Sequence, residues 1–276
     1  MLFRSGPLCA FILAAEELRA ANVELRDWQL IVIGAVEEEA ATSNGARFAA
    51  TQYAPQFCII GEPSGVDGIT LGYKGRLLAD IHVGRAMQHT AGPDASTSET
   101  AVDFWAWAKN FTDNYNIDKS KVFDQIQLAL RHIQSGDDGL SEWCHMTIGL
   151  RLPPAFDSAL VKDIFGKAFI EVTSHTVTGR ASINFMGDEN AFRSPKDTPL
   201  ARAFVDAIRA EKLRPAFKHK TGTADFNVVG PVWQCPIVAY GPGDSSLDHT
   251  PNEHVSIDEF EKAVKVLTHV LRAISN

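Results

Sequence analysis

Hydrophobic positions along the chain follow two periods, and each period predicts one kind of element. Helical spacing of apolar residues predicts helices at about 8–21, 44–53, 98–114, 158–168, 198–213 and 256–274. Continuous or alternating apolar runs predict strands at 30–34, 57–60, 75–83, 126–130, 146–152, 169–177 and 237–240. Ser256, followed by Glu259, is expected to form a capping box at the last helix. This mixture of strands and helices indicates an α/β protein.

The type of hydrophobic pattern changes twice along the chain, between continuous apolar runs and alternating apolar and polar positions. Two such changes predict two domains. From about residue 73 the strands alternate as half-exposed strands do, and the elements follow the order β-α-β-β-α-β. After Pro195 the buried runs return. We therefore expect one domain built from residues 1–72 and 188–276, interrupted by an inserted ferredoxin-like α+β domain at 73–187.

Composition and charge exclude several classes of protein. With 276 residues, 45% of them hydrophobic and 22% charged, the chain is neither a disordered tail nor a collagen-like repeat nor a disulfide scaffold. Its net charge of −8 makes nucleic acid an unfavourable partner. The apolar stretch at 7–15 is too short to span a bilayer, so no membrane partner is expected. Four scattered cysteines, expected to be buried thiols, favour a reducing compartment such as the cytoplasm: Cys9, Cys58, Cys144 and Cys235.

Carboxylates follow two of the predicted buried strands. Glu37, Glu38 and Glu39 come directly after the strand at 30–34, and Glu62 follows the strand at 57–60. In open α/β sheets, ligands bind beyond the carboxyl ends of the strands. Carboxylates at that edge are able to act as a metal ligand and a general base. The alternatives are a solvated acidic loop and an ordinary turn.

A loop rich in glycine and proline at 241–253 carries His249. Together, Glu39, Glu62 and His249 offer oxygen and imidazole donors, a combination that suits zinc or cobalt. An ordinary surface loop is the alternative interpretation.

In order along the chain, these features resemble the metallo-amidohydrolases that include aminoacylase, acetylornithine deacetylase and succinyl-diaminopimelate desuccinylase. The resemblance is carried by the inserted domain and by the motifs Glu-Glu at 38–39, Gly-Glu-Pro-Ser at 61–64, Thr-Gly-Thr-Ala-Asp at 221–225 and His-x-x-Asn-Glu at 249–253. The branch of LysK-type [LysW]-lysine/[LysW]-ornithine hydrolases is most similar, through segments at 72–76, 220–223 and 240–244.

The resemblance implies a fold and a reaction. Residues 1–72 and 188–276 would form a mixed-sheet, zinc-peptidase-like catalytic domain, and 73–187 a lid and dimerisation domain. The reaction would be metal-dependent hydrolysis of an amide, which releases lysine or ornithine from the small acidic carrier LysW in lysine or arginine biosynthesis. Two Zn²⁺ or Co²⁺ ions would serve each intact enzyme, and the enzyme would be a homodimer.

The resemblance also assigns roles to the polar residues. Glu38 resembles the general base, and Glu39, Glu62 and His249 resemble metal ligands. His89 resembles the lid histidine that polarises the scissile carbonyl, although a solvated loop histidine is the alternative.

A further set of residues is implied to bind the substrate. Arg151 is a candidate for holding a carboxylate, because guanidinium groups pair with carboxylates bidentately. A structural ion pair is the alternative for this side chain. The same role follows by resemblance for Thr221, Gly222, Thr223 and Asp225.

A cluster of basic residues before that motif is a candidate docking edge for an acidic carrier. It consists of Lys212, Arg214, Lys218, His219 and Lys220. A solvated face without a partner is the alternative.

The chain departs from the family at its front end. Gly-Pro-Leu at 6–8 matches the tail of a family segment whose metal-bridging Asp then falls on Phe3 and whose Lys falls on Ser5. None of the nine histidines is followed by x-Asp, the motif that supplies a metal ligand. We therefore expect the chain to lack its N-terminal part and to be inactive or nearly so.

Two other functions remain open from the sequence. One is a small-molecule deacylase similar to acetylornithine deacetylase or succinyl-diaminopimelate desuccinylase. The other is a non-catalytic remnant that binds a carboxylate ligand or forms dimers.

Overall fold

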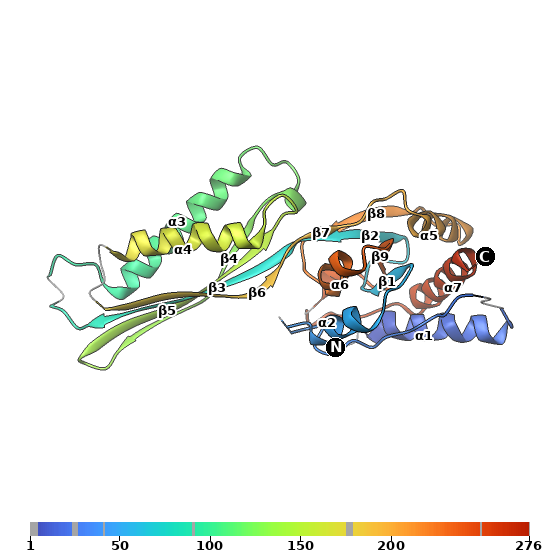
Figure 1. Cartoon of the computed structure of the whole chain (residues 1–276), viewed down its shortest axis with the longest axis horizontal. Coiled ribbons are helices and arrows are strands. Elements are labelled where there is room, and N and C mark those ends of the chain that lie inside the picture. Colours follow the sequence, from blue (N-terminus) through green and yellow to red (C-terminus); the bar gives the residue numbers. More distant parts are fainter. Residues whose placement is uncertain are drawn as a thin grey trace. The chain divides into compact units, whose positions relative to one another are not determined.

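The computed structural model divides the chain into two compact units, which are considered separately (Figure 1). Unit 1 comprises Met1–Tyr73, Phe192–Lys220 and Ala224–Asn276, and unit 2 comprises Lys74–Ala191 and Thr221–Thr223. The structure describes residues 5–23, 27–40, 42–89, 92–174, 179–248 and 250–275.

A mixed five-stranded sheet lies at the centre of unit 1. Its strands are β1 (Cys58–Gly61), β2 (Gly68–Tyr73), β7 (Phe192–Arg193), β8 (Ala216–Lys220) and β9 (Ile237–Tyr240). β1 pairs with β9 in parallel and β8 with β2 in parallel, whereas β2 runs antiparallel to β7 and β9. Gly61 pairs with Tyr240, so the chain leaves β1 and β9 at the same edge of the sheet. The expected α/β architecture with a mixed sheet is confirmed.

Helices pack around this sheet. They are α1 (Ser5–Ala20), α2 (Asn44–Gln52), α5 (Pro199–Ala210), α6 (Asp225–Trp233) and α7 (Ile257–Ile274), with a short 3-10 turn η2 (Ser245–Leu247). α1 and α7 lie side by side (Figure 1). Ala10 of α1 and Leu267 of α7 join a core with Phe204 of α5 and Tyr240 of β9. Burial of these apolar surfaces is what stabilises the helices, because short helices are marginal by themselves.

Unit 2 is an antiparallel sheet with the order β4-β5-β3-β6 and two helices on one face (Figure 1). Its elements are β3 (Gly75–Ala86), α3 (Thr97–Asn116), η1 (Val122–Asp124), β4 (Gln127–Asp137), β5 (Ser141–Leu152), α4 (Ser158–Ser174) and β6 (Arg180–Glu189). Alternate residues of β3 and β5 are buried under the helices, as the period of two requires.

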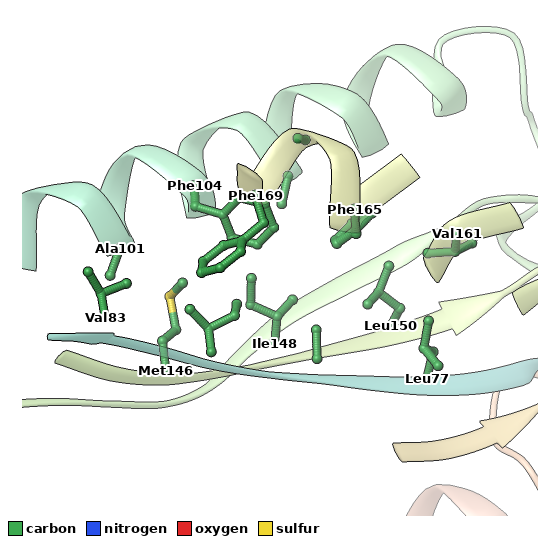
Figure 2. Close-up of a cluster of buried hydrophobic side chains, with 14 of the residues drawn as sticks. Leu77, Val83, Ala101, Phe104, Met146, Ile148, Leu150, Val161, Phe165 and Phe169 are labelled. Carbon is green, nitrogen blue, oxygen red and sulfur yellow. The ribbon is translucent and has the colours of Figure 1, made fainter. Parts of the chain in front are cut away.

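Aromatic side chains of the two helices fill the core of unit 2 (Figure 2). Phe104 of α3 meets Phe165 and Phe169 of α4 edge to face, with ring centroids 6.0 and 5.3 Å apart. Met146 and Ile148 of β5 lie beneath them. Each aromatic pair adds about 0.5–1.5 kcal/mol beyond the area that it buries.

The predicted strand at 30–34 is wrong. Residues 28–35 form no regular element, and no described strand pairs with them. Leu30, Ile31, Val32 and Ile33 are 36–42% exposed. An apolar run shows a preference for burial, but a strand also needs a neighbour that satisfies its backbone hydrogen bonds.

The predicted strand at 169–177 is also wrong over its described part. α4 continues to Ser174, and the following strand, β6, begins at Arg180. Phe169 is 3% exposed in the core, and Thr173 donates its hydroxyl hydrogen to the Phe169 carbonyl one turn earlier at 2.8 Å. Helix packing therefore overrides the strand preference of the β-branched residues.

The four cysteines differ in burial. Cys144 is buried, Cys58 and Cys235 are half-buried, and Cys9 is exposed, so the expectation of four buried thiols is wrong. All four are free. Burial, followed by the nearby Cys235, raises the pKa of the Cys58 thiol, so this sulfur is a poor nucleophile.

Among the described residues, every helix is too short or too polar to cross a membrane.

Candidate active site

The three adjacent glutamates in unit 1 have different surroundings. Glu37 adopts a left-handed backbone with φ 59°, and its Oε2 accepts hydrogen bonds from Thr42 Oγ1 at 2.8 Å and Asn44 Nδ2 at 2.7 Å. It therefore stabilises the turn that leads into α2. Glu38 is half-buried and Glu39 is exposed. The structure thus gives Glu37 a structural role.

Glu62 follows β1 on a loop that is held firmly. Its side chain is only 5% exposed, which is unusual for a carboxylate. Two residues later, Ser64 donates its backbone N–H to the Gly241 carbonyl at 2.9 Å, and its own carbonyl accepts from Lys218 Nζ at 2.7 Å. The backbone that carries Glu62 is thereby fixed to the loop after β9.

The first turn of α1 lies at the same edge of the sheet. A Cβ on Gly61 would lie 3.3 Å from Pro7 Cβ, and a Cβ on Gly241 would lie 2.7 Å from Pro7 Cγ. Only glycine leaves room for this contact at Gly241. The Gly-Pro-Leu segment at 6–8 thus reaches the strand ends near Glu62, and Phe3 lies outside the described residues.

The loop after β9 is ordered by its own side chains. Asp244 Oδ1 accepts from Ser246 N at 2.9 Å and begins η2, and this backbone hydrogen bond lowers the pKa of the Asp244 carboxyl. Leu247 O accepts from Thr250 Oγ1 at 2.8 Å. His249 lies between these residues in the sequence but outside the described residues.

The described residues do not by themselves fit a metal site. Among them, no group of three or more His, Cys, Asp or Glu side chains is placed to hold an ion. Glu38, Glu39 and Glu62 are thus not gathered into such a group. His249, the expected imidazole ligand, lies outside the described residues.

His89 lies in unit 2, on the exposed loop between β3 and α3. Its carbonyl accepts from Gly92 N at 2.8 Å. Glu142 holds both ends of the loop, because its Oε1 accepts from Arg85 Nε and also from Thr97 N at 3.3 Å. The loop that carries His89 is therefore held at both of its ends by the same residue, Glu142.

Arg151 of β5 also belongs to unit 2. Its Nη1 donates to Thr223 Oγ1 at 2.8 Å, and that hydroxyl donates to the Lys74 carbonyl at 2.8 Å. Burial lowers the pKa of Arg151, and the nearby Arg76 and Arg131 lower it further. In the described part of the chain no carboxylate forms an ion pair with Arg151, so the alternative of a structural ion pair finds no support there.

The motif at 221–225 is divided between the units. Thr221, Gly222 and Thr223 belong to unit 2, whereas Asp225 belongs to unit 1. Thr221 is exposed, and Asp225 is 7% exposed at the start of α6. No atom lies within 4 Å of the position that a Cβ on Gly222 would take, so glycine is not needed there for space.

The basic cluster before this motif serves two purposes. Lys218 and Lys220 donate their ammonium hydrogens to the carbonyls of residues 63–64, so these two lysines stabilise the loop that carries Glu62. Lys212 and Arg214 are exposed. His219 and Lys218 are exposed as well, but the Lys218 ammonium group is engaged by a backbone carbonyl, whereas no such contact involves Lys212 or Arg214 among the described residues.

Two structural residues near these loops escaped the sequence analysis. Glu37 looked like one of three equivalent carboxylates, and Glu259 looked like the cap of its own helix. Glu259 Oε1 instead accepts from Val66 N and Gly243 N, each at 3.0 Å. No local pattern marks such residues, because their partners are set by the fold. The nearest signal is an acidic residue at the third position of a helix that follows a glycine-rich loop.

Comparison with known proteins places the chain in a family. The model of peptidase family M20/M25/M40 matches residues 4–273. A [LysW]-lysine hydrolase of Deinococcus radiodurans is 43% identical over 270 residues, which cover 96% of this chain and 72% of the relative. A more distant [LysW]-lysine/[LysW]-ornithine hydrolase of Saccharolobus solfataricus is 22% identical over 276 residues, covering 94% of this chain and 69% of the relative.

Solved structures show the same fold. The M20 family metallo-carboxypeptidase Sso-CP2 of Sulfolobus solfataricus superposes with a TM-score of 0.70 at 16% identity, covering 98% of this chain and 75% of that one. Because the family model spans nearly the whole chain and the Deinococcus relative matches almost all of it, this protein belongs to peptidase family M20/M25/M40, whose members are enzymes that hydrolyse amide bonds.

Proposed function

We propose that the protein hydrolyses the amide bond that joins lysine or ornithine to a LysW-like acidic carrier protein. The observation that carries this proposal is the 43% identity to a [LysW]-lysine hydrolase across 96% of the chain. The reaction would belong to lysine or arginine biosynthesis in the cytoplasm.

The proposed cofactor is Zn²⁺ or Co²⁺, with two ions in an intact enzyme and with Glu39, Glu62 and His249 as ligands. Carboxylate oxygens and imidazole nitrogens are ligands that these ions accept. When bound, such an ion lowers the pKa of its water. The proposal is supported by this donor chemistry and by the rigid loop that carries Glu62.

We assign the proton transfer to Glu38 and the polarisation of the scissile carbonyl to His89. A carboxylate in this role takes a proton from water and later gives it to the leaving amine. One carboxylate oxygen of Glu38 is shielded from solvent, and the turn from residue 37 to residue 44, which contains Glu38, is held by Glu37. An imidazole N–H directed at the developing oxyanion would stabilise it.

Arg151 is proposed to bind the carboxylate of the released amino acid. Its guanidinium is oriented by Thr223 and stands near Arg76 and Arg131, which concentrates positive charge on this part of unit 2. Thr221, Gly222 and Asp225 are proposed as further substrate-binding residues.

The acidic carrier is proposed to dock against Lys212 and Arg214. The chain carries a net charge of −8, so an acidic partner needs a local basic surface to approach it. These two exposed cations lie next to β8, whose Lys218 and Lys220 hold the loop that carries Glu62.

Unit 2 is proposed to be the inserted ferredoxin-like lid and dimerisation domain. Its β-α-β-β-α-β order, antiparallel sheet and one-sided helices support this assignment. The proposed domain boundaries are 1–72 and 188–276 for the catalytic part and 73–187 for the lid.

The release of free amino acid tests the proposal. The purified chain, supplied with Zn²⁺ or Co²⁺, is offered LysW-linked lysine, LysW-linked ornithine and their acetylated counterparts. We expect kcat/KM to be at least about tenfold higher for a LysW-linked substrate, because only it contacts the docking surface. A preference for the acetylated compounds would favour a small-molecule deacylase, and no release from any substrate would favour a non-catalytic remnant.

The expectation of low activity stays a separate prediction. It comes from the absence of a His-x-Asp motif in the printed sequence. We expect the rate of this chain to lie far below that of the Deinococcus radiodurans relative in the same assay. A comparable rate that a chelator abolishes would contradict it.

A further inference from the structure

Glu259 forms only one of the two hydrogen bonds of the capping box that its position in α7 suggests. It is the third residue of a helix capped by Ser256, and its backbone N–H donates to Ser256 Oγ at 3.4 Å. In a capping box, the glutamate side chain would return to the N–H of the capping residue. Here the carboxylate instead binds backbone groups of two other segments.

One oxygen of this carboxylate joins the loops that follow β1 and β9. Glu259 Oε1 accepts from Val66 N at 3.0 Å, in the loop at 61–66, and from Gly243 N at 3.0 Å, in the loop at 241–244. Hydrogen bonds from backbone N–H groups to an ionised carboxylate are about twice as strong as neutral ones. Gly243 has φ 104°, a conformation that side-chain-bearing residues rarely adopt.

The two loops also bind each other directly. Gly65 N donates to the Gly243 carbonyl at 2.9 Å, next to the bond between Ser64 N and the Gly241 carbonyl. Tyr240 Oη donates to the Val66 carbonyl at 2.9 Å. Burial, followed by the nearby Glu259, raises the pKa of Tyr240, so its hydroxyl stays protonated and keeps donating.

An open pocket of about 230 Å³ lies beside these loops and is lined by Ser64, Lys218, Asp244 and Glu259, among other residues. Backbone hydrogen bonds join the two loops directly, and Glu259 supplies two more from a third element.

We propose that Glu259 is a positioning residue: it fixes the loop at 61–66, which follows β1, and the loop at 241–244, which follows β9, relative to each other. The first loop carries Glu62, and the second leads to His249, so a single carboxylate on α7 would set both segments of the candidate site. The consequence for catalysis rests on the proposed function, whereas the coupling of the loops does not.

Hydrogen exchange of the full chain, followed by NMR at single amides, tests this coupling. We expect Glu259→Ala to speed exchange of the Val66 and Gly243 amides together, by about tenfold or more, because both lose a charge-assisted hydrogen bond. Glu259→Gln keeps an acceptor oxygen and is expected to restore part of the protection. Glu261→Ala, on the exposed side of the same helix, is the matched control and should leave both amides unchanged.

The pattern of change decides the outcome. Loss of protection at only one loop, at neither, or equally throughout strands β1 and β9 would overturn the proposal. If Glu259→Ala does not fold, Glu259→Gln decides by the same criterion with a smaller expected change. Failure of the wild-type chain to bind LysW-linked lysine would contradict the proposed function and leave the exchange result standing.

Discussion

Arg85 and Glu142 show how single charged residues in unit 2 hold the loop that carries His89. Arg85 is the last residue but one of β3 and has a side chain that is only 5% exposed, and the side chain of Glu142, opposite it on β5, is 20% exposed. Glu142 also accepts from Thr97 N, at the start of α3. Glu142 therefore binds the residue before the last of β3 and the first residue of α3, on either side of the loop that carries His89.

Removing the carboxylate of this pair should destabilise unit 2 markedly. Glu142→Ala leaves the Arg85 guanidinium buried without its counter-charge, and we expect a loss of about 3 kcal/mol in the free energy of unfolding. Lys109→Ala, which breaks an exposed pair with Asp113, is the control and should cost under about 0.5 kcal/mol. Urea denaturation of both variants measures the difference, and equal losses would contradict the account.

Lys74 gives the stability of the protein a distinctive pH dependence. Its side chain is fully buried, and its Nζ donates to Val122 O at 3.0 Å and Gln127 Oε1 at 3.1 Å. Burial, followed by the nearby Arg151, lowers the pKa of Lys74 from 10.5 to about 8. Between these values the unfolded chain binds more protons than the folded one.

The free energy of unfolding should therefore rise with pH in this range. The contribution of Lys74 to the free energy of unfolding grows as pH increases from about 8 toward 10.5. The reason is that deprotonation of the ammonium group removes a charge whose burial is costly only in the folded state. The check is urea denaturation between pH 7.5 and pH 9.5, with Lys74→Met as comparison. Parallel pH profiles for the two proteins would show that Lys74 contributes nothing to the slope.

At the scale of elements, the sequence pattern predicts best the segments that bury an apolar face, and it predicts poorly those that depend on pairing with another strand. The six expected helices all occur, and the strand at 237–240 has the predicted bounds, because each buries a continuous apolar face. The strands β2, β6, β7 and β8 and the helix α6 were not predicted. β8, for example, exposes three of its five residues and carries three basic side chains, so its strand character comes from pairing with β2.

The residue types of the candidate site were predictable, but their functions in the fold were not. Glu62 and Arg151 stand out in the sequence as a carboxylate at a strand end and a guanidinium beside prolines. Nothing local shows that Lys218 binds the backbone beside Glu62, or that Glu259 reaches two loops. Such contacts join residues far apart in the chain, so only the fold determines them.

The exposure of the apolar segment at 30–36, which was expected to contain a strand and does not, is testable by mutation. Ile31 and Ile33 are 42% and 41% exposed, and Val36 is 68% exposed. We expect Ile33→Ala to change the free energy of unfolding by no more than about 0.5 kcal/mol. Ile148→Ala, at a fully buried position of β5, should cost about 2–5 kcal/mol. A similar cost at both positions would mean that the segment is packed in solution.

At the scale of the whole molecule, charge limits how an acidic carrier approaches. The double substitution Lys212→Glu and Arg214→Glu should raise KM for LysW-linked lysine by about tenfold and leave KM for acetylated lysine unchanged. Neither residue makes the carbonyl contacts of Lys218 and Lys220, so the loop that carries Glu62 is spared. The control is Lys262→Glu on α7, which is also exposed. An equal effect on both substrates would refute docking at this edge.

The central claim is that the substrate is an amino acid carried by a LysW-like protein, and binding tests it independently of turnover. Isothermal titration compares the purified chain against LysW-linked lysine, unmodified LysW and acetylated lysine at low ionic strength. We expect LysW-linked lysine to bind at least about tenfold more tightly than either part alone, because only it engages both the candidate site and the basic edge. Equal affinity for LysW with and without lysine, or no binding of either, would contradict the account.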